Sequence, residues 1–404
     1  MKILQLCHKT PLPAIDGGCI AIHNITQCLL NSGADVKVLA VATPKHPYVV
    51  SAYSKSYLEK TRFESVYIDT TPHKIEALKT LFTGNSYQIS RFYSKNMATK
   101  LSETLKKEDF DIVHIESIYM APYIPLIRKL SKAKILMRLH NIEHQIWERL
   151  SENERNPIMK LAYRVNAHQL KRVERKILHG VDGYMSISEP DYNYFHEAFP
   201  NVPGTVIPFG INLDNYELED DDYIATDHPE LFHIGSMNWS PNVEGILWFL
   251  EEVWPDILAA HPDLTFTLAG HDIPESIRSR HDRNVNVVGS VPNANEFMAE
   301  HDIMIVPLLS GSGIRIKIVE AMALGKVVIT TSIGAEGLDV QDGKHLFIAD
   351  TPEEFVAVIN KCVAMPDICS IISENAQHYI SVHHNNAVIA QQIMDFYQKV
   401  TNKQ

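Results

Sequence analysis

Short apolar runs alternate with longer stretches of helical periodicity along the first half of the chain. The runs have the length and the β-branched content of buried strands, and a helical pattern separates most of them. Such an alternation predicts a parallel sheet that is wrapped by helices. The expected strands are Ile3–Cys7, Val36–Ala42, Ile112–Ile115, Ile135–Leu139, Gly183–Ile187 and Thr205–Ile207.

The second half repeats the scheme, with strands expected at Leu231–Ile234, Leu264–Ala269, Val285–Val288, Ile303–Val306 and Val327–Thr330. Only helical patterns follow residue 353. Because 404 residues exceed one ordinary core, we expect an α/β protein with two Rossmann-like domains that face each other across a cleft. The domains are predicted at 1–207 and 208–384, and a last helix, 385–404, is predicted to cross back to the first. The joint lies at Pro208-Phe209-Gly210 and the acidic run 217–222.

One turn in the second half has the composition of a ligand site. It follows the strand Ile303–Val306, contains Gly311, Ser312 and Gly313, and precedes a helical apolar stripe that Gly325 ends. Glycines let the backbone come close to a ligand, and the free N–H groups of a helix start favour an anion. The turn therefore predicts a phosphate site.

Charged residues follow this turn at positions that strengthen the prediction. Arg315 and Lys317 stand in or next to the first helical turn, where positive charge opposes the helix dipole unless an anion lies between them. Glu320 comes one turn later on the same side and could accept from two ribose hydroxyls. Each residue alone is more typical of a solvated helix face, and only their combination favours a ligand.

Two motifs in the first half also follow predicted strands. The turn Asp16-Gly17-Gly18 lacks the full dinucleotide fingerprint, so it is either a ligand turn or a tight turn required by packing. His140 emerges at the carboxyl end of its strand, where open α/β folds bind ligands. The segment His140–His144 does not match a metal motif, so hydrogen bonding by His140 is favoured over metal binding.

Charge, cysteine content and the lack of long apolar runs limit the possible classes of protein. A formal net charge of −12 argues against nucleic-acid binding, and five cysteines without paired spacing suggest neither disulfides nor zinc. No signal peptide or membrane span is evident, so a cytoplasmic protein is expected. The basic stretch 155–176 is either a solvated helix face or a peripheral contact with the inner face of the membrane.

These motifs together resemble a known family. The segment 311–328, which contains Glu320-Ala321-Met322-Ala323-Leu324-Gly325, is similar to the signature of the group-1 (family 4-like) glycosyltransferases of bacterial polysaccharide and glycolipid synthesis. Supporting segments are Asp16-Gly17-Gly18, 111–114, 207–212, 233–237, 268–270 and 288–292. The resemblance covers nearly the whole chain and implies the two-domain GT-B architecture, a nucleotide-sugar donor and retention of anomeric configuration.

The resemblance also implies roles for particular residues. Glu320 would bind the ribose hydroxyls, Arg315 and Lys317 the diphosphate, and His140 would face the transferred sugar. Neither a metal nor a further cofactor is implied, and the departing phosphate would help to take the acceptor's proton. The remaining residues implied at the nucleotide and along the cleft are Gly17, Gly18, Gly235, Met237, Val291, Gly311, Ser312, Gly313 and Ile314.

Two departures from the family pattern leave alternatives open. Ser312 replaces a common glutamate, and the neutral segment 237–242 replaces a common Arg and Lys, whose charge Arg315 and Lys317 could supply. The leading hypothesis is transfer of a hexose from a UDP- or GDP-sugar to a glycan, lipid-linked or small acceptor. The alternatives are a nucleotide-sugar epimerase, which could use His114, Glu116 and Glu143, and a transferase-like subunit without activity.

Overall fold

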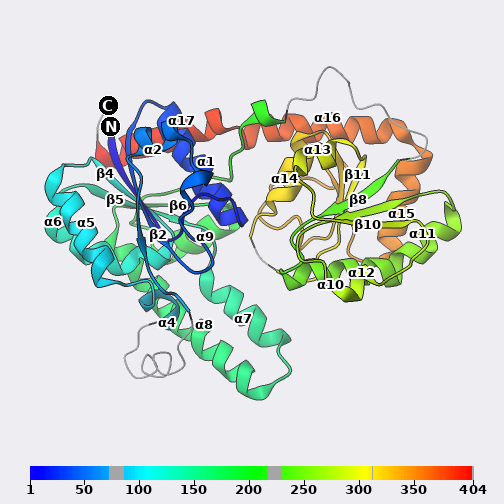
Figure 1. Ribbon diagram of the computed structural model, residues 1–404, viewed down its shortest axis with the longest axis horizontal. Helices are drawn as coiled ribbons and strands as arrows, with labels where there is room; N and C mark the ends of the chain where they lie inside the picture. The colour runs from blue at the N-terminus through cyan, green and yellow to red at the C-terminus, as the bar shows by residue number, and fades with distance from the viewer. Residues whose placement is uncertain (72–85, 217–228, 312, 403–404) are drawn as a thin grey trace. The chain divides into compact units, whose positions relative to one another are not determined.

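The computed structural model describes residues 1–71, 86–216, 229–311 and 313–402. The chain divides into two compact units, each built on its own sheet (Figure 1). Unit 1 comprises Met1–Gly210 and Asn386–Gln404, and unit 2 comprises Ile211–Asn385. The predicted acidic run 217–222 and Ser312 lie outside the described residues.

Unit 1 contains a seven-stranded sheet in which every pair of neighbours is parallel. Its order is β3-β2-β1-β4-β5-β6-β7, so the chain starts in the middle and builds outward to both edges. The central strands are apolar on both faces because helices cover both. The strands are β1 (Lys2–Cys7), β2 (Asp35–Ala42), β3 (Glu64–Tyr67), β4 (Ile112–Glu116), β5 (Lys134–Leu139), β6 (Gly183–Ser186) and β7 (Gly204–Val206).

Two helices from opposite ends of the chain cover one face of this sheet. Helix α1 (Gly17–Asn31) packs beside α17 (Asn386–Thr401), and the two share one apolar core with the sheet. A second apolar core of unit 1 includes side chains of its remaining large helices. The further helices of unit 1 are α2 (Lys55–Thr61), α4 (Tyr87–Ser90), α5 (Lys95–Lys107), α6 (Ile124–Leu130), α7 (Glu143–Asn153), α8 (Pro157–Ile177) and α9 (Glu189–Ala198).

Unit 2 contains a six-stranded parallel sheet with the order β10-β9-β8-β11-β12-β13. Its strands are β8 (Leu231–Ile234), β9 (Phe266–Ala269), β10 (Val285–Gly289), β11 (Ile303–Val306), β12 (Val327–Thr330) and β13 (Phe347–Ile348). Its helices are α10 (Ser240–Trp248), α11 (Trp254–Ala260), α12 (Glu275–Arg278), α13 (Ala294–Ala299), α14 (Ile316–Ala323), α15 (Pro352–Ala364) and α16 (Pro366–His383). The prediction of two Rossmann-like α/β halves is confirmed.

Two strands were not predicted from the sequence, and both lie at sheet edges. Strand β3 reads Glu-Ser-Val-Tyr and is only partly buried, so it lacks the apolar run of a central strand. Strand β13 has only two residues. An edge strand such as β3 is covered less completely, and its sequence is correspondingly less apolar, whereas β13 is apolar but too short to give a strand pattern.

Among the described residues, no single helix is both long enough and apolar enough to span a bilayer. The pair α15 and α16 passes the same criteria only when joined, and the two helices are bent by 104° where they meet.

Candidate functional site

The turn between β11 and α14 is the centre of the candidate site in unit 2. Gly311 has a φ of +121°, and a Cβ placed there would lie 2.9 Å from Arg315 Nη2 and 3.0 Å from the Trp239 ring. Only glycine therefore fits both the backbone conformation and the space. The turn ends at Arg315, the residue before α14, as the sequence predicted.

Arg315 is held rather than solvated, with 6% of its surface exposed. Its Nη1 donates to the backbone oxygen of Gly313 (2.8 Å), and its guanidinium lies 5.2 Å from the centre of the Trp239 ring. This stacking is a cation–π contact, which orients the planar group. The guanidinium is thus fixed beside the glycine turn.

Lys317 lies in the first turn of α14 and reaches two residues of the neighbouring β8–α10 region. Its Nζ donates to Asn242 Oδ1 (2.9 Å) and lies 3.2 Å from His233 Nε2. Because His233 Nδ1 donates to the backbone oxygen of Ile305 (2.7 Å), its Nε2 is the acceptor. Asn242 belongs to the neutral segment 237–242, which replaces a common Arg and Lys of the resembled family. The ammonium of Lys317, which belongs to another helix, contacts this segment.

The electrostatics of Lys317 favour an anionic ligand. Burial, and secondarily the charge of Arg315, lowers the pKa of Lys317 to about 7. Burial and Lys317 together hold the pKa of His233 well below its usual range, so this imidazole is neutral. An anion beside the ammonium would restore its charge, because opposite charges stabilise each other strongly where water is excluded.

Directly after β8, the site also requires a glycine, because a larger residue would collide with its neighbours. A Cβ at Gly235 would lie 3.0 Å from Lys317 Nζ and 2.9 Å from Asn242 Nδ2. The predicted residue Gly235 therefore leaves room for the lysine and the asparagine. Next to it, Met237 is buried, and its N–H donates to the backbone oxygen of His271 (2.8 Å).

Glu320 lies one turn after Lys317 and has a polar partner from another segment. The Tyr216 hydroxyl donates to Glu320 Oε1 (3.0 Å), and burial raises the pKa of Glu320 to about 7. A carboxyl group with a raised pKa at a sheet's carboxyl edge is typical of a functional position. Tyr216 was not predicted from the sequence.

The other predicted residues of unit 2 have no charged chemistry of their own. Gly313 and Ile314 lie in the same turn. The side chain of Ile314 packs against Gly337, where an added Cβ would lie only 3.0 Å from Ile314 Cγ1. Val291 follows β10 and is partly buried. Their contacts with a nucleotide stay predictions.

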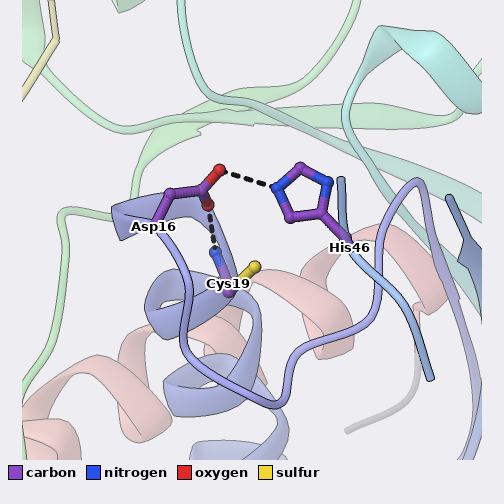
Figure 2. Close-up of side chains that lie close together, drawn as sticks. All are labelled: Asp16, Cys19 and His46. Atoms are coloured by element: carbon purple, nitrogen blue, oxygen red, sulfur yellow. Dashed lines mark hydrogen bonds and ion pairs between the residues drawn. The ribbon is translucent and has the colours of Figure 1, made fainter. Parts of the chain in front are cut away.

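In unit 1 the turn before α1 is built around one carboxylate (Figure 2). Asp16 caps α1 by accepting from the Cys19 N–H (3.0 Å), and it accepts from Lys9 Nζ (2.9 Å). The predicted residues Gly17 and Gly18 form the first turn of the helix, and a Cβ at Gly18 would lie 2.5 Å from Lys9 Nζ. Gly18 therefore makes room for the lysine.

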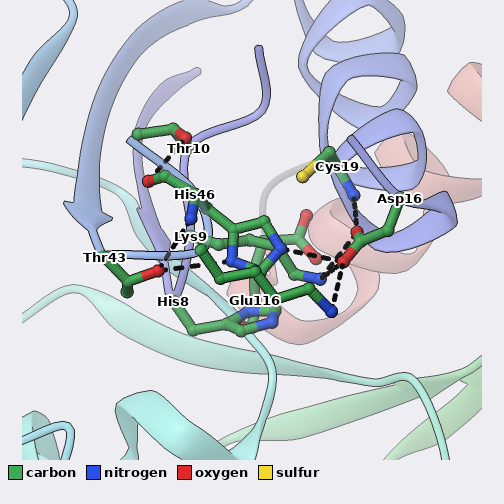
Figure 3. A network of polar contacts seen from close by, with 9 residues as sticks. His8, Lys9, Thr10, Asp16, Cys19, Thr43, His46 and Glu116 are labelled. Carbon is green, nitrogen blue, oxygen red and sulfur yellow. Dashed lines mark hydrogen bonds and ion pairs between the residues drawn. The ribbon is translucent and has the colours of Figure 1, made fainter. Parts of the chain in front are cut away.

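Asp16, Cys19 and His46 are close enough together to suggest a metal site. However, the ammonium of Lys9 contacts both carboxylate oxygens (2.9 and 3.2 Å), and His46 Nε2 lies 2.8 Å from Oδ2. Burial raises the pKa of the Cys19 thiol to about 11, so the sulfur is protonated and a poor metal ligand. Figure 3 shows Lys9 and His46 meeting at Asp16, which we interpret as an ion-pair network.

His140 lies directly after β5, as predicted, and its Nε2 is 3.0 Å from Glu116 Oε2. His144 turns instead to Glu174, so the two histidines do not converge on a common ligand position. His114 and Glu116 are wholly buried, so these two of the three side chains proposed for an epimerase do not reach a substrate directly. The favoured interpretation of His140 as a hydrogen-bonding residue agrees with these contacts.

Several residues of both clusters were not singled out from the sequence. Lys9 is local to Asp16, in the same segment after β1. His233, Asn242 and Trp239 reach Lys317 and Arg315 because the strand order brings separate segments to the same edge. The available sequence signal was their position, since His233 lies within a predicted strand and the other three follow one. A position alone does not distinguish a site residue from a polar residue of a turn.

The protein thus consists of two Rossmann-like α/β units, one of which has a guanidinium beside a glycine turn and an ammonium and a carboxyl group on the helix that follows. The description "Glycosyl transferases group 1" matches residues 228–365, and "Glycosyltransferase Family 4" matches residues 15–215. The chain belongs to the group-1, family 4-like glycosyltransferases.

Individual relatives agree with this family. An uncharacterized 44.6 kDa protein in the cps region of Klebsiella pneumoniae is 25% identical over 86% of this chain and 87% of its own. The phosphatidyl-myo-inositol mannosyltransferase of Mycobacterium tuberculosis is 22% identical over 74% of this chain and 77% of its own. The crystal structure of Anabaena HepE in complex with UDP matches 99% of this chain and 100% of that one, with a TM-score of 0.66 and 18% identity.

Proposed function

We propose that this glycosyltransferase moves a hexose from a UDP- or GDP-sugar to a glycan, lipid-linked or small-molecule acceptor, with retention of configuration and without a metal. The observation that carries the proposal is the placement of Arg315 beside the glycine turn of unit 2, with Lys317 and Glu320 on the helix that follows it. Each of them is at least partly buried, which a solvated helix face would not require.

The three side chains match the parts of a nucleoside diphosphate. A diphosphate would accept from the guanidinium of Arg315 and the ammonium of Lys317, which together supply the charge that the neutral segment 237–242 lacks. The carboxylate of Glu320 would accept from ribose hydroxyls. Backbone amides of the 311–313 turn would complete the anion site, and Val291 would lie near the base.

The same groups would stabilise the leaving group during transfer. As the sugar–phosphate bond breaks, negative charge develops on the departing diphosphate, where fixed cations act most strongly. In the proposed front-face reaction the phosphate oxygen takes the proton of the attacking hydroxyl, and His140 faces the transferred sugar. No metal is required in this scheme because Arg315 and Lys317 neutralise the diphosphate.

The named relatives support the donor and acceptor classes. HepE was crystallised with UDP, and the mycobacterial relative is a mannosyltransferase for a phosphatidylinositol. Both are consistent with a hexose donor linked to a nucleotide, and the second with a lipid-linked acceptor.

Calorimetry with UDP and GDP tests the site. Arg315→Ala and Glu320→Ala should each weaken binding of the preferred nucleotide about 10- to 100-fold, the effect of losing a charged hydrogen bond. Arg280→Ala is the matched control, because this arginine of unit 2 pairs with Glu251 and Asp282 away from the turn. Unchanged affinity in both test variants would show that the nucleotide binds elsewhere.

A second assay separates a transferase from an epimerase. The protein is incubated with single UDP- and GDP-hexoses, first without and then with candidate acceptors, in the presence of EDTA. A metal-independent transferase should form a glycoside only when an acceptor is present. Conversion of the sugar nucleotide to its epimer without an acceptor would overturn the proposal.

A peripheral membrane contact is the remaining part of the proposal, and it rests on helix α8. Ile158 and Leu161 are 77% and 63% exposed near the start of this helix, which pairs with α7 in a helical hairpin (Figure 1). Lys160 and Arg164 lie among them. Apolar side chains flanked by cations are typical of a surface that inserts shallowly into an anionic bilayer.

A further inference from the structure

Glu116 ends β4 as a completely buried carboxylate, with 0% of its surface exposed. Gln5 Nε2 donates to its Oε1 (3.0 Å), and His114 Nε2 lies 3.0 Å from the same oxygen. His140 Nε2 lies 3.0 Å from the other oxygen, Oε2. N–H groups from Gln5 on β1 and from His140 after β5, the two strands that flank β4, thus bind one oxygen each of the same side chain.

The charge of this carboxylate determines which ring nitrogens carry hydrogen. Burial alone would raise the pKa of Glu116, but the facing His114, His140 and Arg138 groups hold it well below its usual range. An ionised carboxylate only accepts hydrogen bonds. The Nε2 atom of His140 is therefore protonated. The ring of His114 is held through Nδ1, which is hydrogen-bonded to the Tyr397 hydroxyl.

His8 is fixed by the backbone of the same residue. Its Nδ1 lies 3.0 Å from the backbone oxygen of Glu116, so Nδ1 donates and Nε2 is left as the acceptor. The rings of His8 and His140 lie 5.9 Å apart between centroids. Both rings are at the carboxyl edge of the sheet, where open α/β folds bind ligands.

Both imidazoles are neutral at physiological pH. Burial lowers the pKa of His140, and the charge of Arg138 and that of Lys9 oppose its protonation, against the favourable effect of Glu116. Burial and the charge of Lys9 likewise hold the pKa of His8 well below its usual range. A neutral ring that donates through one nitrogen offers a lone pair on the other.

We infer that Glu116 is a positioning residue, which fixes the ring orientation and the Nε2–H tautomer of His140 so that Nδ1 accepts a hydrogen bond from a hydroxyl of the transferred sugar. The inference rests on the proposed function, in which His140 faces that sugar. Glu116 itself touches no substrate, since it is buried behind the histidine. The tautomer matters because an Nδ1–H group would confront the sugar hydroxyl with a donor in place of an acceptor.

The first test reads the tautomers directly in the full-length protein. With ¹⁵N-labelled histidine, long-range ¹H–¹⁵N spectra at pH 7 should show His140 as a neutral Nε2–H ring and His8 as a neutral Nδ1–H ring. His→Gln substitutions assign each signal. An imidazolium or an Nδ1–H ring at His140 would overturn the inference.

The second test uses Glu116→Gln, which keeps the size of the side chain. An amide offers one acceptor oxygen, and keeping it on the side of Gln5 preserves that hydrogen bond and leaves the oxygen beside His114 Nε2. Its NH₂ group then faces His140, because Arg138 Nη1, at 3.7 Å from Oε2, is beyond hydrogen-bond range. The NH₂ group can donate only if His140 changes to the Nδ1–H tautomer.

We expect Glu116→Gln to move the His140 signal to the Nδ1–H pattern and to lower kcat about 10- to 100-fold, the usual cost of misplacing a contact at the reacting sugar. The donor KM should change less than about twofold, because the nucleotide contacts of unit 2 are untouched. Glu174→Gln is the matched control, since it alters another buried Glu–His pair of unit 1, with His144. It should leave the His140 signal and kcat unchanged.

The outcomes distinguish this inference from the proposed function. If the wild-type protein transfers sugar and Glu116→Gln changes neither the His140 signal nor kcat, the inference is wrong while the transferase stands. If the wild-type protein transfers no sugar from any nucleotide tested, the proposed function fails, and the inference about a sugar contact fails with it. Failure of the proposed function is observed in the wild-type protein, and failure of the inference alone in the Glu116→Gln variant.

Discussion

Lys317 couples nucleotide binding to protonation, because its pKa in the unliganded protein is lowered to about 7. Below that pH the ammonium is charged and can neutralise a diphosphate. As pH rises through 7 the unliganded side chain loses its proton, and binding must then take one up. The affinity for UDP or GDP should therefore fall above pH 7, by up to about tenfold per pH unit.

Calorimetry between pH 7 and 9 measures this effect, and buffers of different ionisation enthalpy report the proton taken up. Lys317→Arg should flatten the alkaline decline, because a guanidinium stays charged throughout this range. A wild-type affinity that stays constant up to pH 9, without proton uptake, would contradict the role of Lys317.

The sequence was sufficient to predict Arg315, Lys317 and Glu320, because their spacing within one strand–turn–helix unit is local. Their partners His233, Asn242 and Tyr216 come from other segments. Nothing in a single sequence states that β8 pairs with β11, and this pairing brings His233 to Lys317. Residue-scale chemistry is thus predictable where it is local and not where it depends on strand order.

At the scale of elements, the central strands were predictable because apolar residues on both faces leave a clear pattern. Strand β3 was missed because it is only partly buried and lacks an apolar run, and β13 because it has only two residues. The basic stretch 155–176 was predicted to be a helix and corresponds to α8 (Pro157–Ile177). Its pattern of charges did not predict which of its apolar side chains are buried and which are exposed. The exposure of Ile158 and Leu161 separates them from the buried Ala167 and Leu170 further along.

We expect the exposed start of α8 to bind anionic lipid surfaces. The double variant Ile158→Ser, Leu161→Ser should reduce co-sedimentation with phosphatidylglycerol-containing vesicles several-fold, because each change removes about 1.5 to 3 kcal/mol of apolar insertion at most. The transfer activity with a soluble acceptor should not change. Ile371→Ser is the control, since Ile371 is 56% exposed on α16 without belonging to this patch.

Equal binding of wild type and double variant, or equal binding of wild type to neutral and anionic vesicles, would refute the membrane contact. A change in the oligomeric state of the double variant, without any effect on vesicles, would instead assign the patch to contact with a second copy of the chain.

At the scale of the whole molecule, the chain completes its first unit with its last helix. The sequence predicted two α/β halves from the repeated strand pattern and a returning helix from the absence of further strands. It could not predict which surface α17 (Asn386–Thr401) covers. In the structure this helix packs on α1, and Ile389, Ile393 and Tyr397 are wholly buried there.

Removal of residues 386–404 should therefore destabilise unit 1 selectively. Burial of Ile389, Ile393, Phe396 and Tyr397 contributes about 1.5 to 3 kcal/mol each, which together approaches the whole stability of a typical domain. In the truncated chain, limited proteolysis with mass spectrometry should find 1–210 cleaved rapidly and 211–385 still protected. Because the nucleotide residues lie in unit 2, binding of UDP or GDP should persist.

Gln391→Ala, on the exposed face of the same helix, should change neither the cleavage pattern nor nucleotide binding. Simultaneous loss of protection in both regions would mean that unit 2 depends on unit 1 for its stability, and that the two sheets do not fold as independent halves.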